Sequence, residues 1–244
     1  MTRILAWNLN HRSRPKRIPA GVVDAIRPLH PDILVLNEYV QGTDHRRLWD
    51  DLRSMGLGFI KISERRPGHN QVLMASRRDF IVGAVPAPSI QCDSHGRTNF
   101  LAASFREPEF TLIGMRAPAY ESAKLVRAYW GELTETLRVT ASRKVVVIGD
   151  MNGDPENEKS IGGQHLAALR AEGWKIPRAE GDWSYKADSG AYTTRIDHVV
   201  ASPGIRMASA SYITALPGIV VAGTRAEAAL SDHAICLGVV DIGG

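Results

Sequence analysis

The chain has 244 residues, of which 44% are hydrophobic and 23% are charged, and its formal charge at pH 7 is +4. This composition is that of a soluble globular protein and argues against a disordered, fibrous or disulfide-rich chain. The small positive excess favours a polyanionic partner without requiring one.

The organisation of the chain is simple. No linker-like segment or internal repeat divides it, so we expect a single domain over residues 1–244. It has neither an N-terminal secretory pattern nor an apolar run of about 20 residues, so we expect a cytoplasmic protein without a membrane anchor. Cys92 and Cys236 lie far apart in the sequence and are expected to be buried free thiols.

The first part of the chain combines short strands with helices. Apolar runs predict strands over Ile4 to Asn8 and Ile33 to Leu36, and apolar residues at helical spacing predict a helix over Ala20 to Leu29 between them. A second helix is predicted over Leu48 to Met55, ended by Gly56. Short strands separated by Gly, Pro and charged turns follow at Phe59 to Ser63, Gln71 to Ser76, Ile81 to Val85, Phe100 to Phe105 and Phe110 to Met115.

The second part contains the clearest helix signal, an amphipathic pattern over Ala123 to Leu137, directly before a strand over Lys144 to Ile148. The remaining predicted elements are a helix over Gly163 to Glu172 and strands over Trp183 to Tyr185, Arg195 to Ala201, Ala208 to Ile213 and Ala234 to Val239. Roughly ten strands with three or four helices indicate an α/β protein in which two sheets pack face to face with helices outside.

The most informative segment is the strand before Gly149. Val145 to Ile148 are four consecutive β-branched residues, which suits a strand covered on both faces. The run stops at Gly149-Asp150-Met151-Asn152, whose residue types are typical of turns. Asp150 and Asn152 are therefore expected at the mouth of a sheet, where ligand-contacting loops stand on a rigid support.

The same arrangement recurs along the chain, because other apolar runs also begin or end in residues that can bind a metal or a phosphate. These residues are Asn8, Glu38, Asp197 with His198, and Ser231-Asp232-His233. One such junction would be weak evidence, since Asn and Asp are common in turns. Five junctions in one chain are difficult to explain by turns alone.

The motifs at these junctions resemble those of the endonuclease/exonuclease/phosphatase superfamily, which includes DNase I and the exonuclease III type abasic-site endonucleases. They occur in the family's order: Trp7-Asn8, Leu36-Asn37-Glu38, Gly149-Asp150-Met151-Asn152, Arg195-Ile196-Asp197-His198 and Ser231-Asp232-His233. The resemblance implies a DNase I-like four-layer α/β sandwich, with two mixed sheets flanked by helices. It also implies a metal-dependent phosphoric ester hydrolase.

These residue types support metal-assisted attack of water on a phosphoryl group. Mg²⁺ (or Mn²⁺) takes few protein oxygens and keeps positions for substrate phosphate, which points to Glu38 as principal ligand and Asn8 as auxiliary ligand. The resemblance implies that Asp150 orients or deprotonates the attacking water and that Asn152 holds the phosphate. It further implies that His233, paired with Asp197, binds or protonates a phosphoryl oxygen.

Asp232 would complete the metal site or orient His233.

Simpler interpretations remain open for each residue. Asn8 fits a strand-end turn, Glu38 a surface acid, and Asp150 with Asn152 a structural Asx-turn. His233 fits a hydrogen-bonded core histidine with Asp197 as its partner. His198 would point to the opposite face of an extended segment from Asp197, so we interpret it as structural.

One position departs from the family pattern. The strand before the long helix ends in Arg116, where family members have a histidine or tyrosine. Arginine is not a general acid near neutral pH, but it can bind a phosphate bidentately. We therefore predict that Arg116 contacts the scissile phosphate; an arginine in a surface salt bridge is the alternative. Asn37 also replaces the family's usual glutamine before the metal-binding glutamate.

Clustered basic residues favour nucleic acid, DNA or RNA, as substrate. The expected substrate-binding residues are Arg12, Arg14, Lys16 and Arg17, together with Arg97 of a Gly-Arg pair similar to one in abasic-site endonucleases. Arg65-Arg66 and Arg77-Arg78 add positive charge. Two other functions stay open: hydrolysis of a small or lipid phosphate ester at the same site, and binding of nucleic acid by a catalytically weakened member.

Overall fold

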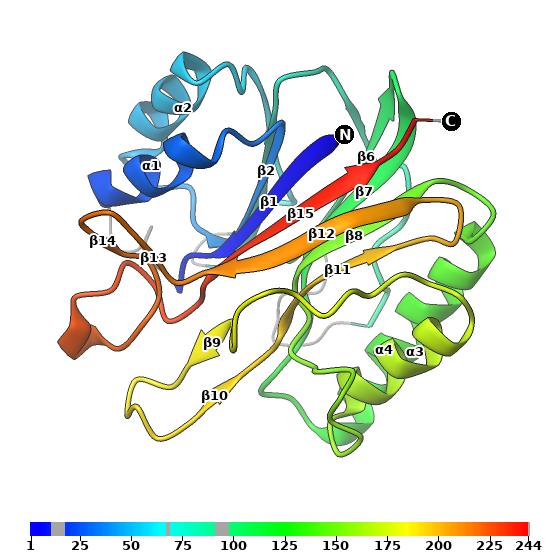
Figure 1. Cartoon of the computed structure of the whole chain (residues 1–244). Coiled ribbons are helices and arrows are strands. Elements are labelled where there is room, and N and C mark those ends of the chain that lie inside the picture. The colour runs from blue at the N-terminus through cyan, green and yellow to red at the C-terminus, as the bar shows by residue number, and fades with distance from the viewer. Residues whose placement is uncertain (11–17, 67–68, 91–97, 244) are drawn as a thin grey trace.

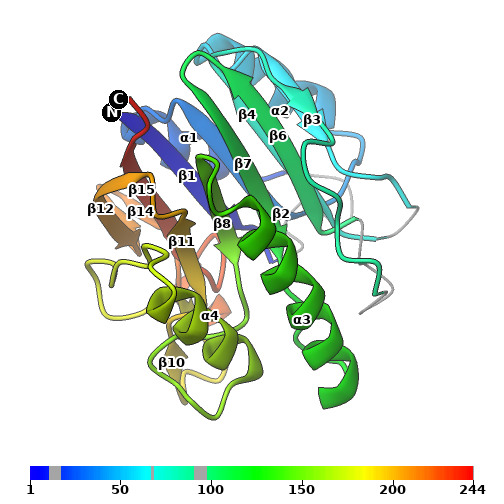
Figure 2. The ribbon, with the colours of Figure 1, turned by 90° about the vertical axis from the view of Figure 1, so that its right-hand side faces the viewer.

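The computed structural model describes residues 1–10, 18–66, 69–90 and 98–243. Two β-sheets pack face to face and helices cover both outer faces, as Figures 1 and 2 show from two directions. The expected α/β sandwich is therefore confirmed. Cys92 and the expected substrate-binding residues Arg12, Arg14, Lys16, Arg17 and Arg97 lie outside the described residues.

The first sheet has six strands in the order β12-β15-β1-β2-β4-β3. Their bounds are β1 Thr2–Asn8, β2 Ile33–Tyr39, β3 Phe59–Ile62, β4 Gln71–Ser76, β12 Arg206–Ile213 and β15 Ile235–Asp241. β1 runs parallel to β2 and antiparallel to β15, which places the first and last strands of the described chain side by side (Figure 1).

The second sheet has five strands in the order β11-β8-β7-β6-β5. Their bounds are β5 Ile81–Val82, β6 Phe100–Arg106, β7 Glu109–Arg116, β8 Val145–Asp150 and β11 Asp197–Ala201. β7 and β8 are parallel, whereas β11 is antiparallel to β8. Since helix α3 (Ala123–Thr140) connects β7 to β8, this is the crossover that a parallel pair requires.

Side-chain alternation in the strands creates the layers. In β2, Ile33 and Val35 face the core between the two sheets, while Leu34 and Leu36 face the helices. Burying each such aliphatic side chain stabilises the fold by roughly 1.5–3 kcal/mol. Because every residue of β2 is buried, the strand is apolar without polar alternation until Asn37.

Helices α1 (Ala20–Ile26) and α2 (His45–Ser54) pack on the first sheet, and a 3₁₀ turn, Arg27–Leu29, follows α1. Helices α3 (Ala123–Thr140) and α4 (Ile161–Ala171) cover the second sheet (Figure 2). The Ser122 and Ser160 hydroxyls accept hydrogen bonds from backbone N–H groups in the first turns of α3 and α4, which satisfies donors that a helix leaves unpaired. Among the described residues, no helix is long and apolar enough to cross a membrane.

Two small hairpins complete the described structure. They consist of β9 (Tyr185–Lys186) with β10 (Thr193–Thr194), and β13 (Ala215–Leu216) with β14 (Ile219–Val220); a 3₁₀ turn, Arg225–Glu227, follows. The sequence patterns did not predict β13 and β14, because two-residue strands around Pro217-Gly218 have no measurable periodicity. The β9–β10 hairpin projects at the lower end of the view in Figure 1.

Most predicted elements are present with shifted ends. The strand predicted over Arg195 to Ala201 starts only at Asp197, although the Ile196 carbonyl just before it still accepts a hydrogen bond from the Met151 N–H. The strand predicted over Trp183 to Tyr185 is instead Tyr185–Lys186. Cys236 is a buried free thiol, as expected.

The strand directions bring the polar residues to one end of the sandwich. In the parallel pair β1 and β2, Asn8 is in register with Asn37, next to Glu38. In the second sheet, Asp150 is in register with both Arg116 and Asp197. Because parallel strands end at the same edge of a sheet, residues separated by more than 140 positions meet there.

Candidate active site

Asp150 lies at the centre of the polar cluster. Its Oδ2 accepts a hydrogen bond of 2.9 Å from Asn8 Nδ2, and its Oδ1 accepts one of 3.0 Å from the Asn152 N–H. Asn8 Nδ2 also donates to Glu38 Oε1 at 3.3 Å. One amide group therefore bridges a carboxylate from each sheet.

Arg116 adds the positive charge of this cluster. Its Nε lies 2.9 Å from Glu38 Oε1 and 3.6 Å from Asp150 Oδ2. Only 8% of the residue is exposed, so the alternative of a surface salt bridge is wrong. A buried guanidinium between two carboxylates has its charge compensated, as a buried cation requires.

The backbone at this edge adopts conformations that most residues avoid. Glu38 has φ 52° and Asn152 has φ 44°, both in the left-handed region. The pairing of β2 with β4 shifts register between Leu36 and Tyr39, which accommodates Glu38. Such backbone conformations cost on the order of 1–3 kcal/mol and concentrate at functional sites. Asn tolerates this region better than Glu does.

Gly149 is required by its surroundings. Its φ is +138°, and a Cβ atom there would lie 2.1 Å from the Met115 carbonyl oxygen and 2.7 Å from Asn37 Oδ1. Glycine thus allows β8 to approach both β7 and β2 closely at the residue before Asp150. The Asn37 side chain, which replaces the family's usual glutamine, lies against this glycine.

His233 and Asp197 form a second buried pair. His233 Nδ1 lies 2.9 Å from Asp197 Oδ2. Burial opposes protonation of the imidazole, but Asp197 through charge and hydrogen bonding, with Asp150 and Asp232, raises the pKa of His233 to about 10. The histidine is therefore an imidazolium cation near neutral pH.

Several groups hold this pair in place. Ser184 Oγ accepts hydrogen bonds from the N–H groups of Ile196 and Asp197, and the Tyr212 hydroxyl donates to the Asp197 carbonyl. The Trp7 indole N–H donates to the His233 carbonyl at 2.9 Å. No motif in the sequence identified Ser184 or Tyr212, because their contact with Asp197 depends on how distant segments pack.

The Ser231-Asp232-His233 segment is joined to the first strand. The Ser231 hydroxyl donates to the Asn8 carbonyl at 2.7 Å and accepts from the His233 N–H. Asp232 Oδ1 lies 3.9 Å from His233 Nε2. Burial raises the pKa of the Asp232 carboxyl, and repulsion from Glu38 contributes in the same direction. Asp232 therefore faces the same polar cluster.

Burial also raises the pKa of Asp150, and repulsion from Asp197 adds to the effect. The charges of His233 and Arg116 oppose it, and the resulting pKa is about 6. Asp150 is therefore mostly ionised at neutral pH yet more basic than an ordinary aspartate. This is the range that suits a group accepting a proton from water.

The donor groups fit a hard divalent cation. Among the described residues, no three His, Cys, Asp or Glu side chains form a cluster that could hold a metal ion. Mg²⁺, however, keeps several waters and is commonly held by one or two carboxylates. Glu38, one of the two carboxylates that face the Asn8 amide, supplies such a donor. Asn8 presents Nδ2 to them, while its Oδ1 accepts from the Asn10 N–H, so a ligand role would require the amide to turn.

The other predicted residues occupy clear positions. Asn152 Nδ2 donates to the Ala117 carbonyl at 2.7 Å, which joins the loops after β7 and β8. His198 is buried, its Nε2 lies 2.9 Å from the Gly153 carbonyl, and burial lowers its pKa. These contacts agree with the structural interpretation of His198.

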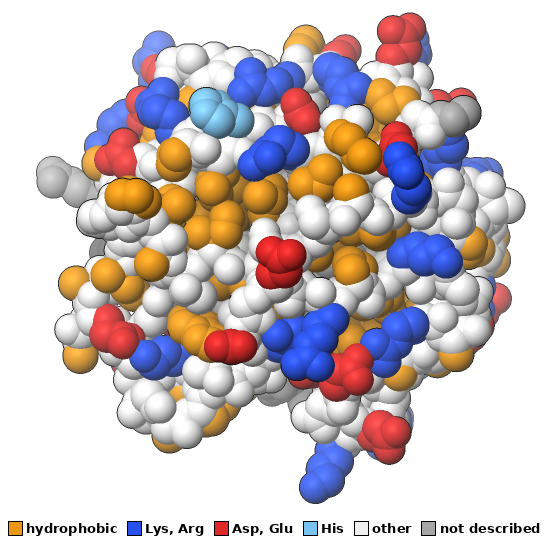
Figure 3. Space-filling view, in the orientation of Figure 1, with side chains coloured by type: hydrophobic (Ala, Val, Ile, Leu, Met, Phe, Trp, Pro, Cys, Tyr) orange, Lys and Arg blue, Asp and Glu red, His pale blue; other side chains and the backbone are white. Residues whose placement is uncertain are grey.

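The arginines at positions 66, 77 and 78 are engaged locally. Arg66 pairs with Glu64, Arg77 lies 4.0 Å from Asp32, and Arg78 donates to the Glu107 carbonyl. Figure 3 shows positive and negative side chains interspersed on one face of the molecule. Neither observation indicates a continuous basic surface on the described residues in view.

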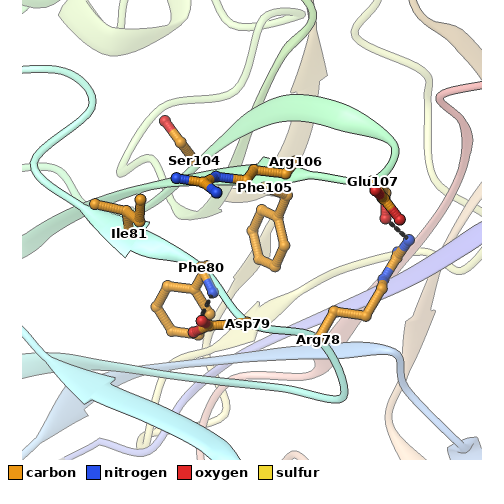
Figure 4. A pocket seen from close by; sticks show the side chains of 8 residues that line it. All are labelled: Arg78, Asp79, Phe80, Ile81, Ser104, Phe105, Arg106 and Glu107. Atoms are coloured by element: carbon orange, nitrogen blue, oxygen red, sulfur yellow. Dashed lines mark hydrogen bonds between the residues drawn. The ribbon is translucent and has the colours of Figure 1, made fainter.

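A separate hollow of about 450 Å³ lies at the other end of the second sheet. Figure 4 shows Phe80 and Phe105 in it, with Arg78 and Arg106 at its edges. Arg106 is in register with Glu109 at the start of β7, whereas Arg116 ends that strand. The hollow is therefore distinct from the cluster around Asp150.

Comparisons with known proteins identify similar structures. The structure is similar to that of a Neisseria 3′ phosphatase, NExo, bound to a product DNA hairpin, with 21% sequence identity, a TM-score of 0.70 and coverage of 99% of this chain and 100% of that one. An AP endonuclease from Archaeoglobus fulgidus gives 18% identity, a TM-score of 0.68 and coverage of 99% and 100%. TDP2 from C. elegans has 16% sequence identity and a TM-score of 0.66, with coverage of 97% of this chain and 74% of that one. No curated sequence gives a significant match.

At these identities the likeness to solved structures establishes the fold. A family model supplies the classification, because that of the Endonuclease/Exonuclease/phosphatase family matches residues 5–233. The match spans every motif from Trp7 to His233. The chain therefore belongs to the endonuclease/exonuclease/phosphatase family, whose members are hydrolases of phosphoric esters.

Proposed function

We propose that this protein is a divalent-metal-dependent phosphodiesterase that hydrolyses phosphodiester bonds of DNA or RNA. The observation that carries the proposal is the position of Asp150. It lies between the amide of Asn8, the guanidinium of Arg116 and the Asp197–His233 pair, with a pKa of about 6. An amide, a guanidinium and an imidazolium thus surround one carboxylate that can act as the base.

The proposed reaction is direct hydrolysis. Asp150 takes a proton from a water molecule while the water oxygen forms a bond to phosphorus. The bond between phosphorus and the leaving oxygen breaks with its electron pair, and the leaving oxygen then takes a proton from solvent water, to which Asp150 later returns its own. Asn8 and the Asn152 N–H hold the two oxygens of Asp150, so the orientation of this base is fixed before substrate binds.

The two cations would stabilise the negative charge that develops on the phosphoryl oxygens. His233 is oriented by Asp197 through Nδ1, which leaves Nε2 directed toward the side of Asp232. Arg116 offers a planar donor group suited to a phosphate. A divalent ion held by Glu38, with Asn8 or Asp232, would add charge neutralisation at the phosphoryl and leaving oxygens.

Several observations support nucleic acid as the substrate. The structural neighbours include a protein described with a product DNA hairpin and an AP endonuclease. The sequence places five basic or histidine residues between positions 11 and 17, directly after the strand that contains Asn8. Positive charge close in sequence to a site residue favours a polyanionic substrate.

The proposal is tested by incubating labelled single- and double-stranded DNA and RNA with purified protein in Mg²⁺, Mn²⁺ or EDTA. Asp150→Asn and Glu38→Ala serve as inactive controls, and Arg206→Ala, an exposed residue, serves as an active control. Cutting that requires metal and is lost in both inactive variants supports a nuclease. Binding of a polymer without any cutting would favour a catalytically weakened binding protein.

The second candidate is hydrolysis of a small or lipid phosphate ester, because the same residues would serve it. The dependence on salt concentration distinguishes this candidate from a nuclease. Nuclease binding should weaken steeply between about 50 and 200 mM salt, whereas turnover of a small ester should change little. Metal-dependent phosphate release from small esters, with every polymer intact, would favour the second candidate.

A further inference from the structure

Tyrosine side chains lie on one side of the proposed phosphoryl site. Tyr185 lies in β9, and its ring centroid is 5.0 Å from that of His233, with the rings inclined at 54°. Its centroid is also 6.1 Å from that of Tyr192, which lies near the tip of the β9–β10 hairpin. The contact with His233 places aromatic surface directly beside a group expected to bind phosphate.

The hairpin that presents these rings is anchored to the site. Tyr185 forms a β-bridge with His233, and the Lys186 N–H donates to the Asp232 carbonyl at 2.9 Å. The Lys186 ammonium pairs with Glu227 at 2.8 Å, which fastens the hairpin to the segment before Ser231. Tyr185 therefore has a position fixed relative to the Ser231-Asp232-His233 segment.

Tyr120 lies in a different segment, the loop between β7 and α3. It follows Arg116 by four residues, in the loop whose Ala117 carbonyl is bound by Asn152. The charges of Arg116, Glu38, Tyr192 and Asp150 all act on its hydroxyl. Tyr120 is thus near both the proposed site and the hairpin.

Two of these side chains are largely open to solvent. Tyr120 is 86% exposed and Tyr192 is 59% exposed. Single exposed aromatic residues are common and need no explanation. Here Tyr120 and Tyr192, together with the half-buried Tyr185, come from separate segments and lie near the same polar cluster.

We propose that Tyr120, Tyr185 and Tyr192 form a nucleobase subsite, in which a base next to the hydrolysed phosphodiester stacks on tyrosine. The inference rests on the proposed function and makes its substrate more specific. Stacking on aromatic side chains tolerates every base, because each base has a π face. It also requires a base that is not paired in a duplex, so the subsite favours single-stranded or unpaired ends.

The test uses a substrate with one defined phosphodiester. Thymidylyl-thymidine is compared with the matching dinucleotide analogue in which both bases are removed, in Mn²⁺ at constant ionic strength. Wild-type protein should have a kcat/KM at least about tenfold higher for the substrate with bases, which is the effect of one stacked base. Tyr120→Leu/Tyr192→Leu should lose this preference, while Tyr120→Phe/Tyr192→Phe should keep it.

Phe59→Leu is the matched control, because Phe59 is an exposed aromatic residue on β3, at the far edge of the first sheet. Equal kcat/KM for both substrates in wild-type protein, or a preference that survives the double leucine variant, would overturn the subsite. If wild-type protein cleaves neither dinucleotide nor any polymer, the proposed function fails instead. Calorimetry with thymidine monophosphate and base-free deoxyribose 5-phosphate then decides the subsite separately, since equal affinity would refute it.

Discussion

Arg116 Nε lies 2.9 Å from Glu38 Oε1, so a guanidinium contacts the carboxylate that is the expected principal metal ligand. The same nitrogen lies 3.6 Å from Asp150 Oδ2. The two oxygens expected to serve metal binding and proton transfer therefore share one cation. We therefore expect this contact to link metal affinity to phosphate binding through a residue at which the chain departs from its family.

Replacing Arg116 by Ala should lower kcat/KM by more than about tenfold, because the phosphate loses a charged donor. The same variant should bind Mn²⁺ at least about threefold more tightly, since Glu38 and Asp150 lose a competing positive charge. Activity is measured at saturating metal, and affinity by calorimetric titration. Arg206→Ala should leave both unchanged. Unaltered activity and affinity in Arg116→Ala would remove this residue from the site.

His233 should titrate near pH 10, because its pKa is raised to about that value. A histidine whose folded pKa is raised contributes stability that is fully present below about pH 6.5 and is lost as pH rises through about 10. In Asp197→Asn the imidazole stays buried without its main anionic partner, so its pKa should fall well below 10. Nitrogen-detected NMR titration of the imidazole measures this directly. Identical titrations in the two proteins would contradict the pairing.

Asp150→Asn should be inactive and yet more stable than the wild type above pH 6. Burial raises the pKa of Asp150 to about 6, so its contribution to stability is present below about pH 4 and is lost as pH rises through about 6. Asparagine carries no charge and avoids this loss. Urea unfolding at pH 7.5 and pH 4 checks the prediction, and the gain should vanish at the lower pH. A variant less stable than wild type at pH 7.5 would contradict the destabilisation of the charged Asp150 carboxylate by burial.

Gly149→Ala should lower Tm by at least about 5 °C, because a Cβ atom would lie 2.1 Å from the Met115 carbonyl in a left-handed conformation. It should also reduce activity by displacing Asp150. Gly131→Ala is the matched control. Gly131 lies within α3 with open space at the Cβ position, so alanine should raise stability by up to about 1 kcal/mol. Calorimetric melting of both variants distinguishes a local clash from a general intolerance of alanine.

The strands, and the polar residues at the end of β8, could be predicted to lie where they do because their signals are local. The apolar run from Val145 to Ile148 and its abrupt end at Asp150 describe a buried strand leading into a polar loop. The Asp197–His233 pair was predictable only through the order of motifs in a known family. His198 could be separated from Asp197 because neighbouring residues of a strand face opposite sides.

What could not be predicted depends on contacts between distant segments. Arg116 was compatible with a surface salt bridge until the packing of β7 against β2 and β8 buried it between two carboxylates. Ser184 belongs to no motif. It accepts hydrogen bonds from the Ile196 and Asp197 N–H groups only because the fold brings that later segment beside it. The orientation of the Asn8 amide follows from two carboxylates on different sheets.

In the proposed reaction, water activated by Asp150 attacks phosphorus in a nucleic acid. Single-turnover cleavage of a labelled oligonucleotide in ¹⁸O-water with Mn²⁺, followed by mass spectrometry of the products, tests it most directly. We expect one ¹⁸O atom in the product phosphate, none in the sugar hydroxyl, and no product with EDTA or with Asp150→Asn. A product phosphate without ¹⁸O, or undiminished cleavage by Asp150→Asn, would contradict it.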